Sequence, residues 1–320
     1  MNRKQYADMM KDINDTRVNG GDVTACIAKY RKMYQYVYVY NDSCFKKIFG
    51  SVGNRELASS FLNAVLKFDG EDCIGIQDFV DPSIPGGPFV KSITSDIVAK
   101  DTNNDRIVIE VQHKGDNLYK DRLVFYRARH TLQNKLPGDD YELRKMYFIA
   151  LQLFDSFPNS GNYRHCVQLK DDENHIFFEK DSLTIVEIKK FLEKGYSNDF
   201  SSLAEWLRAV DHVNNECSAP LPGNRYLEDL QNCAKLCNFD ENYLVNEAKI
   251  MTDHAYELSV ERKEARAEGL AEGRAEGRAE GYDEATRKIV LNQLKKGKSI
   301  EEIAEDCLVT VDYVQSLTNR

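Results

Sequence analysis

The sequence feature that most constrains the fold is residues 95–112, where a polar segment separates two apolar ones. Residues 93–100 are rich in β-branched side chains, which favour an extended strand. Residues 101–105, Asp-Thr-Asn-Asn-Asp, are typical turn formers, and residues 106–112 are a second and more apolar segment. This order predicts a β-hairpin.

Two carboxylates are expected to converge on this hairpin. Side chains along a strand alternate between its two faces, so Glu110 and Gln112 share one face and the apolar residues beside them can be buried on the other. Antiparallel pairing can bring Asp96, on the first strand, near Glu110. Such a pair can hold Mg²⁺, which takes oxygen ligands and keeps several waters. On its own this spacing is a weak pattern, and solvated carboxylates at strand ends are the simpler interpretation.

Segments on either side of the hairpin make the pattern more specific. They are Asp-x-x-Phe-Lys-x-Ile-Phe-Gly at 42–50, Ser-Phe-Leu-Asn-Ala-Val-Leu at 60–66, Arg-x-x-x-Tyr at 122–126 and an apolar strand at 146–154. In this order the set resembles the recombination-promoting nuclease (Rpn) and transposase family, which belongs to the PD-(D/E)XK nuclease superfamily. That family has Glu-Met-Gln in place of the usual Glu-x-Lys, and residues 110–112 here are Glu-Val-Gln.

The resemblance implies a fold, a reaction and a set of site residues. The fold is α/β, a PD-(D/E)XK (restriction-endonuclease-like) mixed sheet flanked by helices, with a helical C-terminal extension. The reaction is metal-dependent hydrolysis of DNA phosphodiester bonds, with Asp96 and Glu110 binding Mg²⁺ or Mn²⁺. Gln112 completes the catalytic set, where the superfamily usually has lysine. Asp42 and Lys46 become accessory candidates, although a helix N-cap and a solvated lysine are their simpler interpretations.

Three residues of a predicted helix at 116–136 are candidates for contact with DNA. Arg122, Tyr126 and Arg129 are spaced by four and three residues, so they share one helix face. Two arginines and an aromatic ring can contact phosphates and stack on a base or a sugar. Without the resemblance, a solvated amphipathic face is the simpler interpretation.

The composition narrows the class of protein. No apolar run approaches the roughly 20 residues that a membrane helix needs, and the first residues do not resemble a signal peptide. The expected location is therefore the cytoplasm, with no membrane partner. The net charge of −9 argues against a broad nucleic-acid footprint, although a local basic groove is compatible with it. The eight cysteines are scattered without a Cys-x-x-Cys pair, so we expect them to be reduced.

Four segments are expected along the chain: a nuclease-like domain at 1–215, a helical extension at 216–263, a linker of Ala-Glu-Gly-Arg repeats at 264–284 and a small helix-turn-helix-like module at 285–320. Glycine at every fourth position costs a helix about 1 kcal/mol per residue against alanine, so the repeat indicates a spacer. Ser299 and Glu302 form a predicted capping box in the last module.

The last module leaves its role open. It holds six basic residues (Arg287, Lys288, Lys295, Lys296, Lys298, Arg320) and five acidic ones (Glu301, Glu302, Glu305, Asp306, Asp312). That balance is barely positive for a DNA-binding module, and homodimerisation through these helices is the alternative. For the whole chain the alternatives to a DNA endonuclease are an RNA-directed nuclease and a weak or inactive nuclease fold that acts as a DNA-binding or protein-interaction module.

Overall fold

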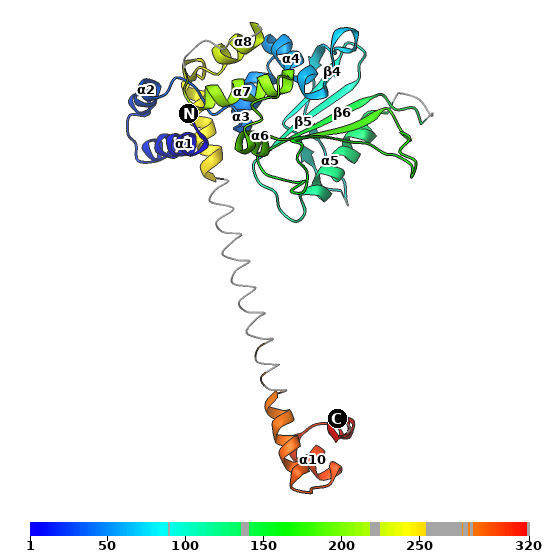
Figure 1. The fold of residues 1–320 in the computed structure, drawn as a ribbon. Coiled ribbons are helices and arrows are strands. Elements are labelled where there is room, and N and C mark those ends of the chain that lie inside the picture. Colours follow the sequence, from blue (N-terminus) through cyan, green and yellow to red (C-terminus); the bar gives the residue numbers. More distant parts are fainter. Residues whose placement is uncertain are drawn as a thin grey trace. The chain divides into compact units, whose positions relative to one another are not determined.

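The computed structural model describes residues 1–88, 90–135, 141–217, 225–253, 277, 281 and 284–318. The chain forms two compact units, residues 1–249 and residues 250–320 (Figure 1). The predicted repeat linker at 264–284 lies outside the described residues, apart from Gly277, Gly281 and Glu284. Each unit is therefore described by itself.

One mixed sheet of six strands forms the centre of the first unit within the described residues, in the order β1-β4-β5-β6-β8-β7 (Figure 1). Its strands are β1 (Ile76–Phe79), β4 (Ile97–Asp101), β5 (Arg106–Gln112), β6 (Met146–Gln152), β7 (Arg164–Val167) and β8 (Asp181–Glu187). Strands β5, β6 and β8 are parallel, and the outer pairings are antiparallel. All seven residues of β6 are buried, as expected for a parallel strand covered on both faces. The predicted mixed α/β sheet is confirmed.

Helices cover the sheet on both sides. Helix α5 (Tyr119–Gln133) packs on one side, where its Tyr119 and Leu123 join an apolar cluster with Val108 of β5 and Phe148 of β6. Helix α5 begins after the predicted position 116 because the Asp116 carboxylate accepts a hydrogen bond from the amide of Leu118 and holds a turn there. Helices α4 (Arg55–Leu66) and α7 (Ser202–Asn214) lie on the opposite side (Figure 1).

The remaining helices of the first unit lie at its two chain ends and around the sheet. They are α1 (Arg3–Val18), α2 (Val23–Met33), α3 (Asp42–Phe49), α6 (Ile188–Lys194) and α8 (Arg225–Cys233), with the 3₁₀ turns η1 (Val52–Asn54), η2 (Gly70–Asp72) and η3 (Leu236–Asn238). Residues 241–253 are also helical. In the parts of the chain that the structure describes, no helix is both long and apolar enough to cross a membrane.

The hairpin differs from the prediction at its first strand. Strand β5 has the predicted bounds, whereas β4 begins only at Ile97 and pairs with β5 from the Ile97–Ile109 position onward. Residues 93 and 94 instead form β3 (Ile93–Thr94), which pairs with β2 (Ser83–Ile84) in a separate sheet. The reason is local, because the Asp96 side chain rather than a backbone carbonyl accepts the hydrogen bond from the amide of Val111.

The second unit contains a small helical core. Residues 284–295 are helical and are followed by α10 (Ile300–Cys307) and α11 (Val311–Thr318). Val290, Ile303, Ala304 and Val314 form its buried cluster. The predicted capping box is confirmed, since the Ser299 side chain accepts from the Glu302 amide and the Glu302 side chain accepts from the Ser299 amide.

Candidate active site

The two predicted carboxylates meet at one end of the hairpin. Continuing the β4–β5 register by one position beyond Ile97–Ile109 places Asp96 across from Glu110. One Asp96 oxygen, Oδ2, accepts a hydrogen bond from the amide of Val111 at 2.7 Å. The other, Oδ1, lies 3.0 Å from Nζ of Lys46, which reaches in from α3. The structure therefore brings Asp96, Glu110 and Lys46 together.

Glu110 is the most unusual group of the site. Its side chain is only 3% exposed, and its Oε1 atom has no hydrogen-bond partner among the described residues. Burial, together with the nearby charge of Asp96, raises the pKa of Glu110 to about 8, although Ser95 and Lys46 oppose the shift. Burial also raises the pKa of Asp96, which Lys46 and the Val111 amide oppose. Two neighbouring carboxylates whose pKa values are both raised by burial mark a candidate functional site.

Asp42 lies beside the pair without capping its helix. The interpretation of Asp42 as an N-cap is wrong, because the preceding Asn41 accepts the hydrogen bond from the Cys44 amide at 3.1 Å. The Asp42 carboxylate is half exposed and lies 3.2 Å from Nε2 of His113. Its negative charge raises the pKa of both Asp96 and Glu110, so it lies within electrostatic reach of them.

Helix α5 presents two of its three candidate residues to the site. Nη2 of Arg122 donates to Oε1 of Gln112 at 3.4 Å. A small hollow beside them is lined by Glu110, Gln112, Tyr119, Arg122, Leu123 and Tyr126. Arg129 is engaged elsewhere, since it donates to the carbonyl oxygens of Lys91 and Pro85 and holds that loop.

A comparison with known families gives one match to this chain. The model of the PD-(D/E)XK nuclease family transposase matches residues 39–261, which is more than half of the chain. The chain belongs to that family. No curated protein matches it, and no solved structure matches it. The PD-(D/E)XK match covers the sheet, α3 and α5, and therefore every predicted site residue.

The residues present fit the divalent metal on which PD-(D/E)XK nucleases generally depend. Asp96 and Glu110 would hold it, and the buried, unpartnered Oε1 of Glu110 is an oxygen that a cation would satisfy. Among the described residues no group of three or more His, Cys, Asp and Glu side chains could form a metal site. Mg²⁺ remains compatible with a pair, because it is commonly bound through one or two carboxylates and keeps several waters.

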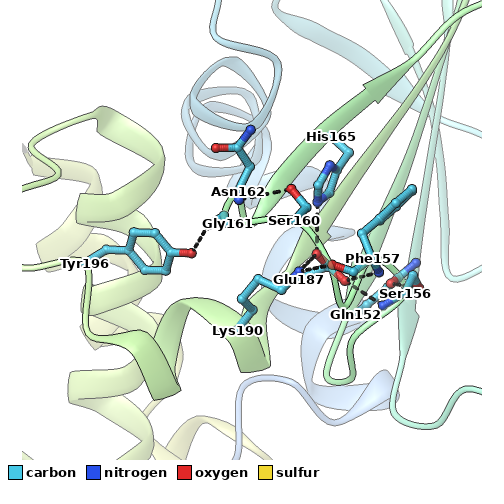
Figure 2. A network of polar contacts seen from close by, with 10 residues as sticks. All are labelled: Gln152, Ser156, Phe157, Ser160, Gly161, Asn162, His165, Glu187, Lys190 and Tyr196. Carbon is cyan, nitrogen blue, oxygen red and sulfur yellow. Dashed lines mark hydrogen bonds and ion pairs between the residues drawn. The ribbon is translucent and has the colours of Figure 1, made fainter.

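A buried polar network at the ends of β6 and β8 was not predicted from the sequence (Figure 2). Glu187, at the end of β8, is fully buried and accepts hydrogen bonds from the amides of Ser156 and Phe157 and from Nζ of Lys190 at 2.6 Å. Nε2 of His165 lies 2.9 Å from its Oε2 atom. These contacts lower the pKa of Glu187 despite its burial. Glu187 is thus a buried carboxylate with a full set of partners, whereas Glu110 leaves one oxygen without a partner among the described residues.

The network reaches the candidate site through Tyr119. Ser156 donates to the Gln152 side-chain oxygen, and the Gln152 amide donates to the Tyr119 hydroxyl at 2.6 Å (Figure 2 shows Ser156 and Gln152). The Tyr119 ring lies 5.6 Å from the guanidinium carbon of Arg122. A fixed Tyr119 thus supports the arginine that contacts Gln112.

Proposed function

We propose that this chain is a metal-dependent endonuclease that hydrolyses DNA phosphodiester bonds, with Mg²⁺ as its ion and Mn²⁺ as a substitute. The observation that carries the proposal is the buried Asp96–Glu110 pair with its unpartnered Glu110 oxygen, in a chain of the PD-(D/E)XK transposase family. DNA is the proposed substrate because nuclease families of this type act on it, and the cytoplasm is the expected location.

The bound ion would lower the pKa of a water molecule and neutralise charge on the phosphate in the transition state. The protein's own residues supply the rest. Asp96 and Glu110 hold the ion, and Lys46, whose side chain is 41% exposed, is within reach of a phosphate. Gln112 is neutral, so its amide can orient a water but adds no positive charge. Arg122 can bind a phosphate oxygen with its fork of donors.

Two finer proposals concern the partners. Arg122 and Tyr126 are the proposed DNA contacts on α5. Arg129 is set behind them because its donors are bonded to the carbonyl oxygens of Pro85 and Lys91. For the second unit we propose homodimerisation. Acidic side chains dominate α10, and Lys298, just before that helix, is already paired with Asp306 at 2.6 Å, which leaves little positive charge for DNA there.

A specific observation favours a second candidate function. Gln112 stands where the superfamily usually has lysine, and the net charge is −9, so a nuclease fold that binds DNA or protein without cutting is the alternative.

Cleavage of supercoiled plasmid tests the proposal. The wild type should cut with Mg²⁺, faster with Mn²⁺ and not with EDTA, and Asp96→Asn and Glu110→Gln should each abolish cutting because each removes a ligand charge at nearly constant volume. Asp105→Asn, at the other end of the same hairpin, is the matched control and should cut normally. If no metal supports cutting and calorimetry finds no metal binding that depends on Asp96, the interaction-module alternative replaces this one.

A further inference from the structure

A line of buried polar side chains runs behind Glu110. Arg106 begins β5, His130 lies in α5 and Ser95 precedes β4, and their side chains are 9%, 0% and 0% exposed. Nε of Arg106 donates to Nδ1 of His130 at 3.2 Å. Nε2 of His130 lies 2.8 Å from Oγ of Ser95. Ser95 also lies close enough to Glu110 for its side chain to favour the ionised carboxylate. Three separate elements thus meet behind one carboxylate.

The chemistry of each group fixes the direction of this line. A guanidinium is a donor only, so Nδ1 of His130 must be the acceptor and carries no proton. Burial, together with the charges of Arg106 and Arg129, lowers the pKa of His130 to about 3, so the ring is neutral. Its single proton therefore lies on Nε2 and is donated to Oγ of Ser95.

The same reasoning extends to the hydroxyl. Because Oγ of Ser95 accepts from His130, its own proton is free to be donated onward, and the Glu110 carboxylate is the acceptor beside it. The ring nitrogens therefore fix the direction of this line as far as the Ser95 hydroxyl. Once a metal ion holds Glu110 in its ionised form, the carboxylate can only accept, and the line then runs from Arg106 to Glu110.

We propose that Ser95, His130 and Arg106 are positioning residues that hold the Glu110 side chain in place for its role at the metal. The inference rests on the proposed function, because it assigns a purpose to the fixed orientation of Glu110. Of the three residues, Ser95 is the one next to the Glu110 side chain. The Oε1 atom of Glu110 has no partner among the described residues, so it is available to a metal ion. Groups that orient metal ligands from outside in this way typically change metal affinity or activity by about 10- to 100-fold when they are removed.

The ring tautomer gives a test that needs neither metal nor cleavage. In the full chain with ¹⁵N-labelled histidine, the His130 ring at neutral pH should be the neutral Nε2–H tautomer, and a His130→Gln sample assigns its signals among the six histidines. A proton on Nδ1, or on both nitrogens, overturns the proposed direction whether or not the protein is a nuclease.

Substitution of Ser95 tests the purpose of the line. Ser95→Ala should bind Mn²⁺ about 10-fold more weakly by calorimetry and cut more slowly, whereas Ser95→Thr retains the hydroxyl and should restore most of both. Thr131→Ala is the control, since it removes the hydroxyl next to His130 that bonds the Arg127 carbonyl instead of the site. Circular dichroism melting should show all variants folded.

The outcomes separate this inference from the proposed function. Normal Mn²⁺ affinity and cutting by Ser95→Ala would overturn the positioning role while leaving the nuclease intact. Equal losses in Ser95→Ala and Ser95→Thr would also overturn it, because packing rather than the hydroxyl would then be responsible. If the wild type neither binds Mn²⁺ nor cuts DNA, the proposed function is wrong. The positioning role of Ser95, His130 and Arg106 is then wrong as well, even if the His130 tautomer is the expected one.

Discussion

Replacing Glu110 with glutamine should make the metal-free protein more stable at alkaline pH. The folded protein favours the protonated form of Glu110, because burial and Asp96 raise its pKa from 4.5 to about 8. A raised pKa contributes stability that is fully present below about pH 4.5 and is lost as the pH rises through about 8. Glutamine has no proton to lose, so Glu110→Gln should keep that stability.

The structure sets the size of the effect. At about 1.4 kcal/mol per pKa unit, a displacement from 4.5 to about 8 corresponds to at most about 5 kcal/mol of unfolding free energy. The wild type should lose up to this amount between about pH 5 and about pH 9 in EDTA, and Glu110→Gln should lose much less. At about pH 5 the two proteins should be nearly equally stable, since Glu110 is protonated there.

Urea unfolding followed by tryptophan fluorescence measures this directly. Trp206 is the only tryptophan and is 1% exposed inside the first unit, so its signal reports the unit that holds the site.

Glu187→Gln is the control, and its effect on stability should have the opposite sign. The pKa of Glu187 is lowered by its partners, so its carboxylate stabilises the fold above its pKa. The substitution should destabilise the protein at neutral pH because the buried charge of Lys190 loses its carboxylate counter-ion. Equal pH-dependent losses in the wild type and Glu110→Gln would refute the reasoning.

Three further results are expected. Arg122→Ala should weaken DNA binding and reduce the salt dependence of the binding constant by about one phosphate contact, and an unchanged slope in titrations at several salt concentrations would return Arg122 to a surface role. Gln112→Ala should lower the single-turnover rate without changing Mn²⁺ affinity, whereas a parallel loss of affinity would make Gln112 a ligand. Deleting residues 266–320 should leave the Trp206 unfolding transition unchanged because residues 1–249 form their own compact unit, and loss of soluble expression would contradict this.

The parts of the fold that could be predicted depend on contacts that are close in sequence. The bounds of β5 follow from its apolar pattern. The convergence of Asp96 and Glu110 follows from the register of a short hairpin. The beginning of β4 was missed because it depends on where one side chain, Asp96, replaces the backbone as the hydrogen-bond acceptor.

The parts that could not be predicted depend on partners that are distant in sequence. His130 bonds Ser95 across 35 positions, and the Ser156 amide bonds Glu187 across 31, so no local pattern marks either contact. A lone histidine in an amphipathic helix and a glutamate at a strand end are ordinary residues until the sheet brings their partners together. Position and burial, rather than residue type, give them their roles.

The local character of the hairpin has a consequence for the order in which the site is assembled. Strands β4 and β5 are joined by a short turn, so little chain entropy opposes their pairing, whereas β5 meets β6 only after a crossover that contains α5. We therefore expect Asp96 and Glu110 to come together first in an exposed hairpin, where water screens their repulsion. Docking of α5 then removes that water. Helix α5 also brings Arg122 and His130 to the site. We therefore expect the free-energy cost of burying the two carboxylates to fall at the folding step in which α5 packs onto the sheet.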